Sequence, residues 1–254
     1  MKVFKLFGAA VISALMLTSC LGDGDNSFSN HGFGVGGIST KGSKPVLFTN
    51  FGALYAPNVT ILPDVCYYTP SFEVDLNTPE NENAAANGYY TAVISSLTEV
   101  IKGGVDFYSP IDTANLKNKE ILIKDMVSGS YVEKYLFLGM SFDARKDQRN
   151  QYQLFWNQRD SISKEDGVSV YSLFMRAVKV SDGTGETTSA SSEFQAFKIG
   201  DVLESIMKKE GREGAEKFKI KINYLNGINE KDSTDLTWKS IKIDCPTIKE
   251  TDKK

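Results

Sequence analysis

The chain carries few of the side chains that enzymes use for nucleophilic or metal chemistry. Its 254 residues include one histidine, His31, and three cysteines, Cys20, Cys66 and Cys245. His31 falls in a glycine-rich stretch that we expect to be a linker, so Ser-His-Asp catalysis, Cys-His catalysis and histidine-ligated zinc are not expected in the folded domains. No CxxC pair is present. We therefore predict no catalytic residue, no cofactor and no metal site.

Two interpretations remain open for the cysteines that lie within the expected domains. Cys66 and Cys245 could form a disulfide in an oxidising compartment, which would join the first domain to the last strand. Alternatively, each is buried separately as a small apolar side chain. A disulfide requires Cα atoms within about 7 Å of each other, and sequence alone does not show this.

Carboxylates are the remaining candidates for catalysis. Glycoside hydrolysis needs a paired acid and base, and two polar turns offer such pairs. Ordinary solvated hairpins have the same composition, and 32 acidic residues make chance pairs plentiful. We therefore expect a protein that is not an enzyme and keep a carboxylate-dependent glycan-processing enzyme as an alternative. The pairs are Asp143 with Asp147, and Asp160 with Glu165 and Asp166.

Several aromatic residues could instead stack against sugar rings. Adjacent residues of a strand point to opposite faces, so one tyrosine of each adjacent pair is expected to be exposed. Core or rim positions are the alternative for all of them. The candidates are Tyr67, Tyr68, Tyr89, Tyr90, Trp156 and Trp238.

The N-terminus is typical of a bacterial lipoprotein signal. Lys2 and Lys5 precede an apolar run, Leu6–Leu17, that has the length of a signal-peptide core and is too short to span a bilayer. Thr18, Ser19 and Cys20 follow directly, as in a lipobox. We predict that residues 1–19 are removed and that Cys20 is lipidated, which anchors the chain in a membrane. An ordinary secretory signal with a coincidental cysteine is the alternative.

Residues 20–37 are rich in Gly, Ser, Asn and Asp and lack a hydrophobic period, so we expect a flexible tether. Asp23 and Asp25 resemble the acidic surface-export signal of Bacteroidetes lipoproteins. We expect an outer-membrane, lipid-anchored protein, with exposure at the cell surface as one alternative and a periplasmic face as the other.

From residue 38 onward the sequence predicts a mostly β protein. Runs of Val, Ile, Tyr, Phe and Thr alternate with turn-forming clusters. In the clearest example Phe218, Ile220, Ile222 and Tyr224 alternate with polar residues, as in a half-buried antiparallel strand. The expected strands are Val46–Leu54, Val59–Leu62, Ser71–Leu76, Tyr89–Ile101, Glu120–Val127, Val132–Phe142, Gln151–Trp156, Val168–Val180, Glu193–Lys198, Lys217–Leu225 and Leu236–Ile243.

One amphipathic helix interrupts the strands. Its apolar stripe has helical spacing and ends before Gly211, and we expect it to pack on a sheet. The small residues Ser128-Gly129-Ser130 predict a domain boundary, which gives an N-terminal domain of residues 38–128, a C-terminal domain of residues 129–247 and a polar tail of residues 248–254. The stripe consists of Ile199, Val202, Leu203, Ile206 and Met207.

This arrangement resembles the NigD-like lipoproteins of Bacteroidetes. The matching features are Cys20 with its acidic neighbours and the order of aromatic strands in the second half: YLFLG at 135–139, YQLF at 152–155, YSLFMR at 171–176 and FQAF at 194–197. The resemblance implies an OB-like N-terminal barrel followed by a C-terminal β-sandwich. The namesake's association with a bacteriocin locus points to envelope biology and implies no particular activity.

Charge excludes one class of partner. The chain has 29 basic and 32 acidic residues, a net charge of −3, and so no basic footprint for nucleic acid. We expect a non-catalytic binding module whose partners are the membrane, through its acyl anchor, and an unidentified protein or glycan of the envelope or exterior. A fimbria-like assembly subunit that donates a strand is a further alternative.

Overall fold

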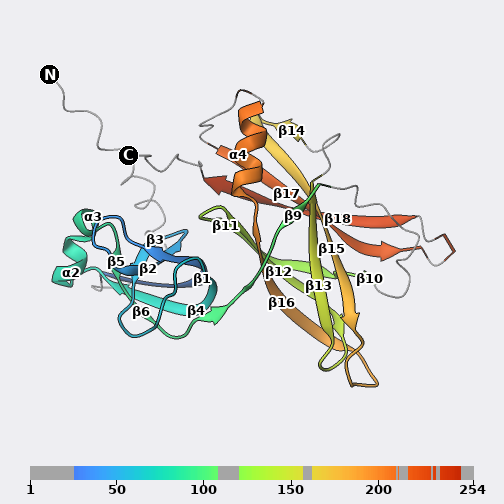
Figure 1. The fold of residues 1–254 in the computed structure, drawn as a ribbon, viewed down its shortest axis with the longest axis horizontal. Helices are drawn as coiled ribbons and strands as arrows, with labels where there is room; N and C mark the ends of the chain where they lie inside the picture. The colour runs from blue at the N-terminus through green and yellow to red at the C-terminus, as the bar shows by residue number, and fades with distance from the viewer. Residues whose placement is uncertain are drawn as a thin grey trace. The chain divides into compact units, whose positions relative to one another are not determined.

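The computed structural model describes residues 26–107, 120–156, 162–209, 211, 217–229, 231–232 and 235–246 (Figure 1). The chain divides into two compact units, Met1–Val100 and Ile101–Lys254, and strands dominate both. The predicted mostly β class is therefore confirmed. The signal peptide, Cys20, Asp23, Asp25, Asp160 and the tail at 248–254 lie outside the described residues. Within the described ranges, no helix has the length and apolar character needed to cross a membrane.

The first unit is one sheet, antiparallel except where β3 and β5 pair in parallel, with two short helices. Its strands follow the order β5-β3-β2-β1-β4-β6, and β7 also pairs with β4. The elements are β1 (Ser27–Ile38), β2 (Pro45–Thr49), β3 (Gly52–Tyr55), β4 (Cys66–Asp75), α2 (Pro79–Glu82), α3 (Ala84–Asn87), β5 (Tyr90–Thr91), β6 (Val93–Ile94) and β7 (Thr98–Glu99).

The predicted barrel is not closed among the described strands. The ends of the strand path are β5 and β6, which are consecutive in the chain and separated by Ala92 alone. Two such segments cannot pair with each other. Instead, the Ala92 N–H donates to the carbonyl of Tyr55 at 2.9 Å, so a single stretch of chain contacts both edges of the sheet.

A neutral side chain fixes this stretch. Asn81 is buried, and its amide donates to the carbonyls of Asp75 and Thr91 at 2.7 and 2.9 Å. Its oxygen accepts from the Thr91 N–H at 2.7 Å. Buried polar groups are stable only when bonded in this way. The core beneath comprises Leu47, Leu54, Ala56, Ile61, Tyr67, Phe72, Val74, Ala92 and Ile94.

The predicted tether at 20–37 is wrong over its second half, because Ser27–Ile38 forms the central strand β1 between β2 and β4. The glycines of β1 are required because neighbouring residues pack closely against its backbone, and not because the segment is flexible. A Cβ at Gly34 would lie 2.6 Å from Leu47 Cγ, and one at Gly36 would overlap the carbonyl of Leu62. The first domain therefore begins well before residue 38.

The second unit is a sandwich of two sheets. One sheet has the order β18-β17-β15-β13-β9, with β10 and β14 also paired to β15, and the other has the order β11-β12-β16-β8. Their strands are β8 (Ile101–Gly103), β9 (Val105–Asp106), β10 (Glu120–Ile121), β11 (Asp125–Val132), β12 (Tyr135–Ala144), β13 (Arg149–Trp156), β14 (Ile162–Glu165), β15 (Val168–Ser181), β16 (Ser189–Lys198), β17 (Lys217–Ile228) and β18 (Leu236–Pro246).

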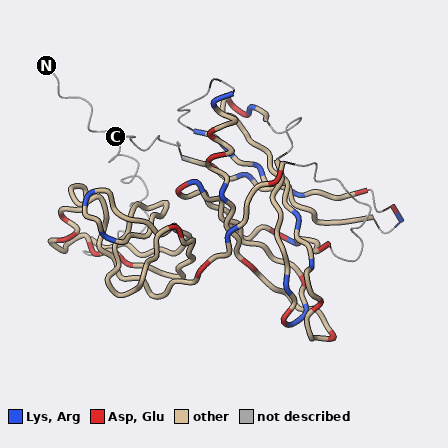
Figure 2. Tube along the Cα trace, viewed as in Figure 1, with Lys and Arg blue, Asp and Glu red and all other residues tan. Residues whose placement is uncertain are grey.

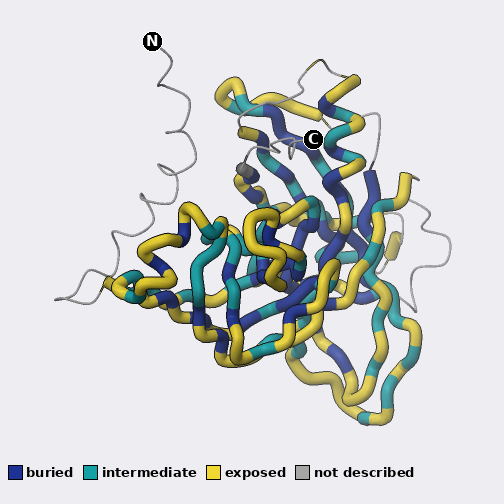
Figure 3. Tube along the Cα trace, turned by 60° about the vertical axis from the view of Figure 1, so that its left-hand side comes forward, coloured by how far each residue is buried: buried dark blue, intermediate teal, exposed yellow. Residues whose placement is uncertain are grey.

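Side chains from both sheets fill one core. Leu136 and Phe142 of β12 join Leu173 of β15 and Ile222 of β17, and all four are buried. Figure 3 draws the buried parts of the chain in dark blue. The alternation predicted for residues 218–224 is observed, because Phe218, Ile220, Ile222 and Tyr224 are all buried. The expected C-terminal sandwich is confirmed.

The predicted helix is α4 (Gly200–Lys209), and it packs on this core through Leu203 and Met207. The N–H groups of Ile199 and Gly200 donate to the carbonyl of Lys134, in the β11–β12 turn. The Lys134 ammonium also pairs with Asp201 and Glu204, each at 3.0 Å. The helix is thus fastened to the end of the sandwich at which β12 begins.

The predicted boundary at Ser128-Gly129-Ser130 is wrong, because these residues lie inside β11 and the two units divide between Val100 and Ile101. Their small size serves packing between β11 and β18. A Cβ at Gly129 would lie 2.6 Å from Ile243 Cδ1.

One buried ion pair fastens the short strand β10 to β15. The Arg176 guanidinium donates to both oxygens of Glu120 at 2.9 and 2.8 Å. The Glu120 side chain is only 1% exposed, so the pair lies in a region of low dielectric.

Candidate functional site

The first unit presents a half-exposed aromatic pair beside a lysine. The rings of Tyr55 and Tyr89 lie 5.6 Å apart at a tilt of 58°. The Lys44 ammonium lies 4.2 Å from the centre of the Tyr55 ring and 6.0 Å from that of Tyr89, within the range of cation–π attraction. We call these three side chains the tyrosine–lysine surface.

Three separate segments position this surface. Tyr55 ends β3, Tyr89 precedes β5, and Lys44 ends a turn closed by the Ser39 N–H bonded to the Lys44 carbonyl at 2.9 Å. The turn is fastened to α3, because the Lys41 ammonium donates to the carbonyl of Ala85 at 3.0 Å. The turn that carries Lys44 is therefore held against α3.

The other predicted aromatic residues are dispersed. Tyr67 is buried and its hydroxyl accepts from the Leu62 N–H at 3.1 Å, whereas Tyr68 is half-buried beside Phe33. Tyr90 packs edge-on to Phe28. In the second unit Trp156 is buried in the core, and Trp238 packs against Phe174 on the other side of its sheet. Of the six candidates, only Tyr89 belongs to the tyrosine–lysine surface.

The candidate carboxylates lie at opposite ends of the sandwich. Asp147 bonds to Thr184, just beyond the last residue of β15, while Glu165 pairs in register with the first residue of β15. A strand rises about 3.3 Å per residue, so the 14 residues of β15 separate the two groups by roughly 40 Å. Acid and base of a glycosidase lie within about 10 Å of each other. These two turns therefore do not combine into one catalytic pair.

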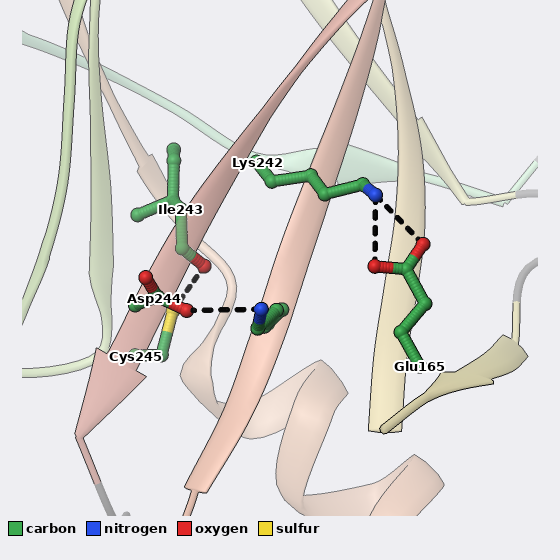
Figure 4. Close-up of polar contacts among 6 residues, drawn as sticks. Glu165, Lys242, Ile243, Asp244 and Cys245 are labelled. Atoms are coloured by element: carbon green, nitrogen blue, oxygen red, sulfur yellow. Dashed lines mark hydrogen bonds and ion pairs between the residues drawn. The ribbon is translucent and has the colours of Figure 1, made fainter. Parts of the chain in front are cut away.

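Three of the described carboxylates, Asp143, Asp147 and Glu165, are held by local partners. Asp143 pairs with Lys124 at 2.7 Å, at the strand end opposite α4. Glu165 accepts from Lys242 through both oxygens, at 2.7 and 2.8 Å, and Lys219 lies 3.7 Å from Asp244 on the same sheet (Figure 4). The hydrogen bond from Lys242 holds the pKa of Glu165 below its usual range. Acidic and basic residues alternate around these turns (Figure 2).

A half-buried polar cluster that links the two sheets was not predicted. The Tyr152 hydroxyl donates to Glu193, and the Asn150 amide donates to the other Glu193 oxygen at 3.3 Å. Burial, followed by the bond to Glu193, raises the pKa of Tyr152 above its usual value. The phenol thus stays protonated, and its bond joins β13 of one sheet to β16 of the other. This arrangement stabilises the sandwich and provides no general base.

The disulfide that was one of two interpretations for Cys66 and Cys245 is not formed in the structure. Cys66 is buried in the first unit and Cys245 in the second. Burial, and then the charge of Asp244, raises the pKa of the Cys245 thiol well above its usual value. Such a thiol is a poor nucleophile, so the alternative of two separately buried cysteines describes the structure.

His31 was expected in a linker, and this expectation is also wrong. It lies within β1, at an irregularity between Asn30 and Gly32, and is exposed. Among the described residues no group of three His, Cys, Asp or Glu side chains could hold a metal ion.

Residues 24–98 match the family described as the lipoprotein OB domain. Over these residues the chain is similar to a lipoprotein OB domain, and we call the first unit the OB domain from here on. This domain coincides with the first unit, and the sandwich follows it. The match explains why the domain must include β1, which sequence patterns assigned to a tether.

Solved structures are similar in fold over most of the chain. An uncharacterised protein of Parabacteroides merdae is similar over 85% of this chain and 98% of its own, with a TM-score of 0.73 and 21% identity. A protein of Bacteroides fragilis assigned as a lipoprotein is similar over 87% of this chain and 100% of its own, with a TM-score of 0.57 and 14% identity. At these identities the likeness establishes the fold alone.

A NigD-like immunity protein of Bacteroides caccae is also similar, with a TM-score of 0.48 and 12% identity over 84% of this chain and 91% of its own. No curated protein matches the sequence. The OB domain match and the Parabacteroides structure confirm the predicted resemblance to Bacteroidetes lipoproteins in which an OB domain precedes a β-sandwich.

Proposed function

We propose that the protein is a non-catalytic binding module, anchored in the outer membrane through Cys20, that binds a glycan through the tyrosine–lysine surface. The observation that carries the proposal is the fixed aromatic pair Tyr55–Tyr89 with Lys44 beside it. The lipoprotein assignment of the OB domain supports an envelope location.

The chemistry of this surface suits a sugar with an acidic substituent. A half-exposed phenol ring packs against the C–H face of a pyranose, and aromatic residues contribute strongly to such contacts. The Lys44 ammonium would donate to a carboxylate or sulfate on the same ligand. Because Lys41 holds the turn of residues 39–44 against α3, the backbone at Lys44 would not have to be ordered on binding.

The contrast with an enzyme also supports the proposal. The described carboxylates Asp143 and Glu165 are each engaged by their own lysine, and they lie at opposite ends of the sandwich. Neither carboxylate belongs to the unit that carries the tyrosine–lysine surface. Binding without turnover is therefore the expected behaviour of the mature chain.

The proposal can be tested with the mature chain carrying Cys20→Ser, screened on an array of neutral and acidic envelope and host glycans. Hits would be measured by isothermal titration calorimetry. We expect Tyr89→Ala to weaken binding at least tenfold, and Lys44→Met to weaken acidic ligands more than neutral ones. Tyr68→Ala is the matched control, because it removes a half-buried tyrosine of the same domain that pairs with Phe33.

Two outcomes would contradict the proposal. Full binding by Tyr89→Ala would place the ligand elsewhere. Hydrolysis of a bound glycan, lost in Asp143→Asn or Glu165→Gln, would establish the alternative of a carboxylate-dependent enzyme. Failure of every glycan would favour a protein partner, to be sought by crosslinking in cells.

The location is a separate part of the proposal. Intact cells would be treated with proteinase K, with Cys20→Ala as the anchor control. Digestion of the protein while periplasmic markers survive would support exposure at the surface. Protection would place it on the periplasmic side, where envelope glycans become the ligands to screen.

A further inference from the structure

A second candidate site lies in the sandwich, at the end closed by α4. There the side chains of Trp156, Ile162, Val202 and Ile206 line a hollow of about 280 Å³. Trp156 ends β13, Ile162 begins β14, and the other two belong to α4, so three elements meet at this point (Figure 1). The site is distinct from the tyrosine–lysine surface and does not rest on the function proposed for it.

The hollow exists because α4 is amphipathic over a wide arc. Leu203 and Met207 point into the core and are buried, whereas Val202 and Ile206 on the neighbouring arc remain half-exposed. The helix cannot roll to bury them, because Lys134 bonds its first turn through both its carbonyl and its ammonium. Apolar side chains are thereby held at the surface of a concavity.

The rim of the hollow is more apolar than an ordinary protein surface. Phe107 is 54% exposed and Ile162 is 39% exposed, although both are large hydrophobic residues. Single exposed apolar residues are common, but several around one concave site are typical of a ligand pocket. The occupant should therefore present mainly hydrocarbon.

Two polar side chains indicate the other end of the occupant. Lys209 is the one charged residue among the described residues that line the hollow, and Ser205 is the other polar one. A lysine beside an apolar cavity is complementary to an anion that carries an apolar chain. A free sugar would need many hydrogen-bonding partners, and these two groups could not supply them.

We propose that this hollow binds a medium-chain carboxylate, with the acyl chain against Trp156, Val202 and Ile206 and the carboxylate at Lys209. A volume of about 280 Å³ holds roughly nine groups of the size of a water molecule. The occupant is accordingly a chain of about eight to ten carbons, well short of a membrane phospholipid.

The position of Trp156 provides a direct measurement. The chain has two tryptophans, Trp156 and Trp238, so Trp238→Phe leaves Trp156 as the only one. Decanoate, kept below its micelle-forming concentration, would be titrated into the mature chain carrying Cys20→Ser and Trp238→Phe. We expect a saturable change in tryptophan emission with one site per chain, confirmed by calorimetry.

Three variants separate the parts of the site. Ile206→Glu should abolish the change by placing a charge on the wall, and circular dichroism would verify that the half-exposed position tolerates it. Lys209→Met should weaken decanoate at least fivefold while leaving decanol unchanged. Lys208→Met, one residue earlier on the same helix, is the matched control and should bind decanoate as before.

Three results would overturn the proposal: no saturable change in Trp156 emission, equal weakening by Lys208→Met and Lys209→Met, or unchanged decanoate binding by Ile206→Glu. The first would exclude a ligand of this class. The second would indicate nonspecific attraction to the helix. The third would place the ligand outside the hollow.

Discussion

The OB domain and the sandwich hold their strands around an apolar core by different means. The OB domain has strands of up to 12 residues, glycines that bring β1 close to its neighbours, and a neutral buried side chain, Asn81, that fixes its edge. The sandwich has strands of up to 14 residues, a larger apolar core and a buried ion pair, Arg176 with Glu120. Backbone proximity organises the first unit, and side-chain packing organises the second.

This contrast predicts that a substitution in one core destabilises only the unit that contains it. Phe72→Ala in the OB domain removes a ring that contacts Phe28 and Phe51, and we expect a loss of about 3–5 kcal/mol. Leu154→Ala in the sandwich should cost about 2–5 kcal/mol. Urea unfolding followed by hydrogen exchange would show protection lost only in the unit that carries the change.

Val180→Ala is the control for both substitutions, because Val180 is 61% exposed and its truncation should change stability by less than about 0.5 kcal/mol. Loss of protection in both units from either core variant would show that the two cores unfold as one.

Breaking the buried ion pair of Glu120 and Arg176 should cause the next largest loss of stability. Glu120→Gln leaves the buried Arg176 guanidinium without its carboxylate, which should cost about 3 kcal/mol. Asp143→Asn removes an exposed partner of Lys124 and should cost less than about 1 kcal/mol. Equal effects of the two substitutions, measured by thermal unfolding, would mean that burial does not distinguish these pairs.

Removing the buried neutral side chain of Asn81 in the OB domain should cost less stability than breaking the buried ion pair. Asn81→Ala removes three hydrogen bonds and leaves the Thr91 N–H without its partner, for an expected loss of about 1–3 kcal/mol. Asn83→Ala, which removes one exposed bond to the carbonyl of Pro79, should have little effect. A loss as large as that of Glu120→Gln would overturn the ranking of the two units.

The smallest effect is expected at Glu165. Its pKa is lowered in the folded state by Lys242, so its contribution to stability is present above the ordinary carboxylate pKa and is lost as pH falls through the lowered value. In Lys242→Met an NMR titration should show the Glu165 midpoint moving upward, without a resolvable change in unfolding at neutral pH. Lys239→Met on the same strand is the control, and an equal shift there would contradict the specific pair.

The contrast between the units also explains which elements sequence could predict. Long strands with one buried face impose alternation, so residues 217–225 and the helix at 200–209 were predicted within a few residues. In β1 the close approach of neighbouring strands requires Gly34 and Gly36, which erases the hydrophobic pattern. Close packing also explains why the domain boundary predicted at Gly129 is wrong: this glycine is required for contact with Ile243. Thus a glycine selected for contact and a glycine selected for flexibility are identical in sequence.

The candidate site was predictable only in part. The rule that adjacent aromatics diverge predicts one exposed tyrosine in the Tyr89–Tyr90 pair but does not say which of the two it is. Tyr55 and Lys44 gave no signal, because they come from separate segments that meet only once β3 and the turn before β2 have formed. The hollow beside α4 was hidden for a related reason. Val202 and Ile206 belong to the same apolar stripe of α4 as the core residues. The helical spacing of the stripe does not show which of its residues the sheets leave exposed.

The early start of β1 sets how far the protein can stand from its membrane. A tether of residues 20–37 would span up to about 60 Å when fully extended, whereas only seven positions separate Cys20 from Ser27, which limits the span to about 25 Å. With Cys20 lipidated, as proposed, the OB domain would be held within one domain diameter of the lipid headgroups. Ligands that it can meet are then those of the layer next to the bilayer, and long surface polymers would have to present their membrane-proximal ends.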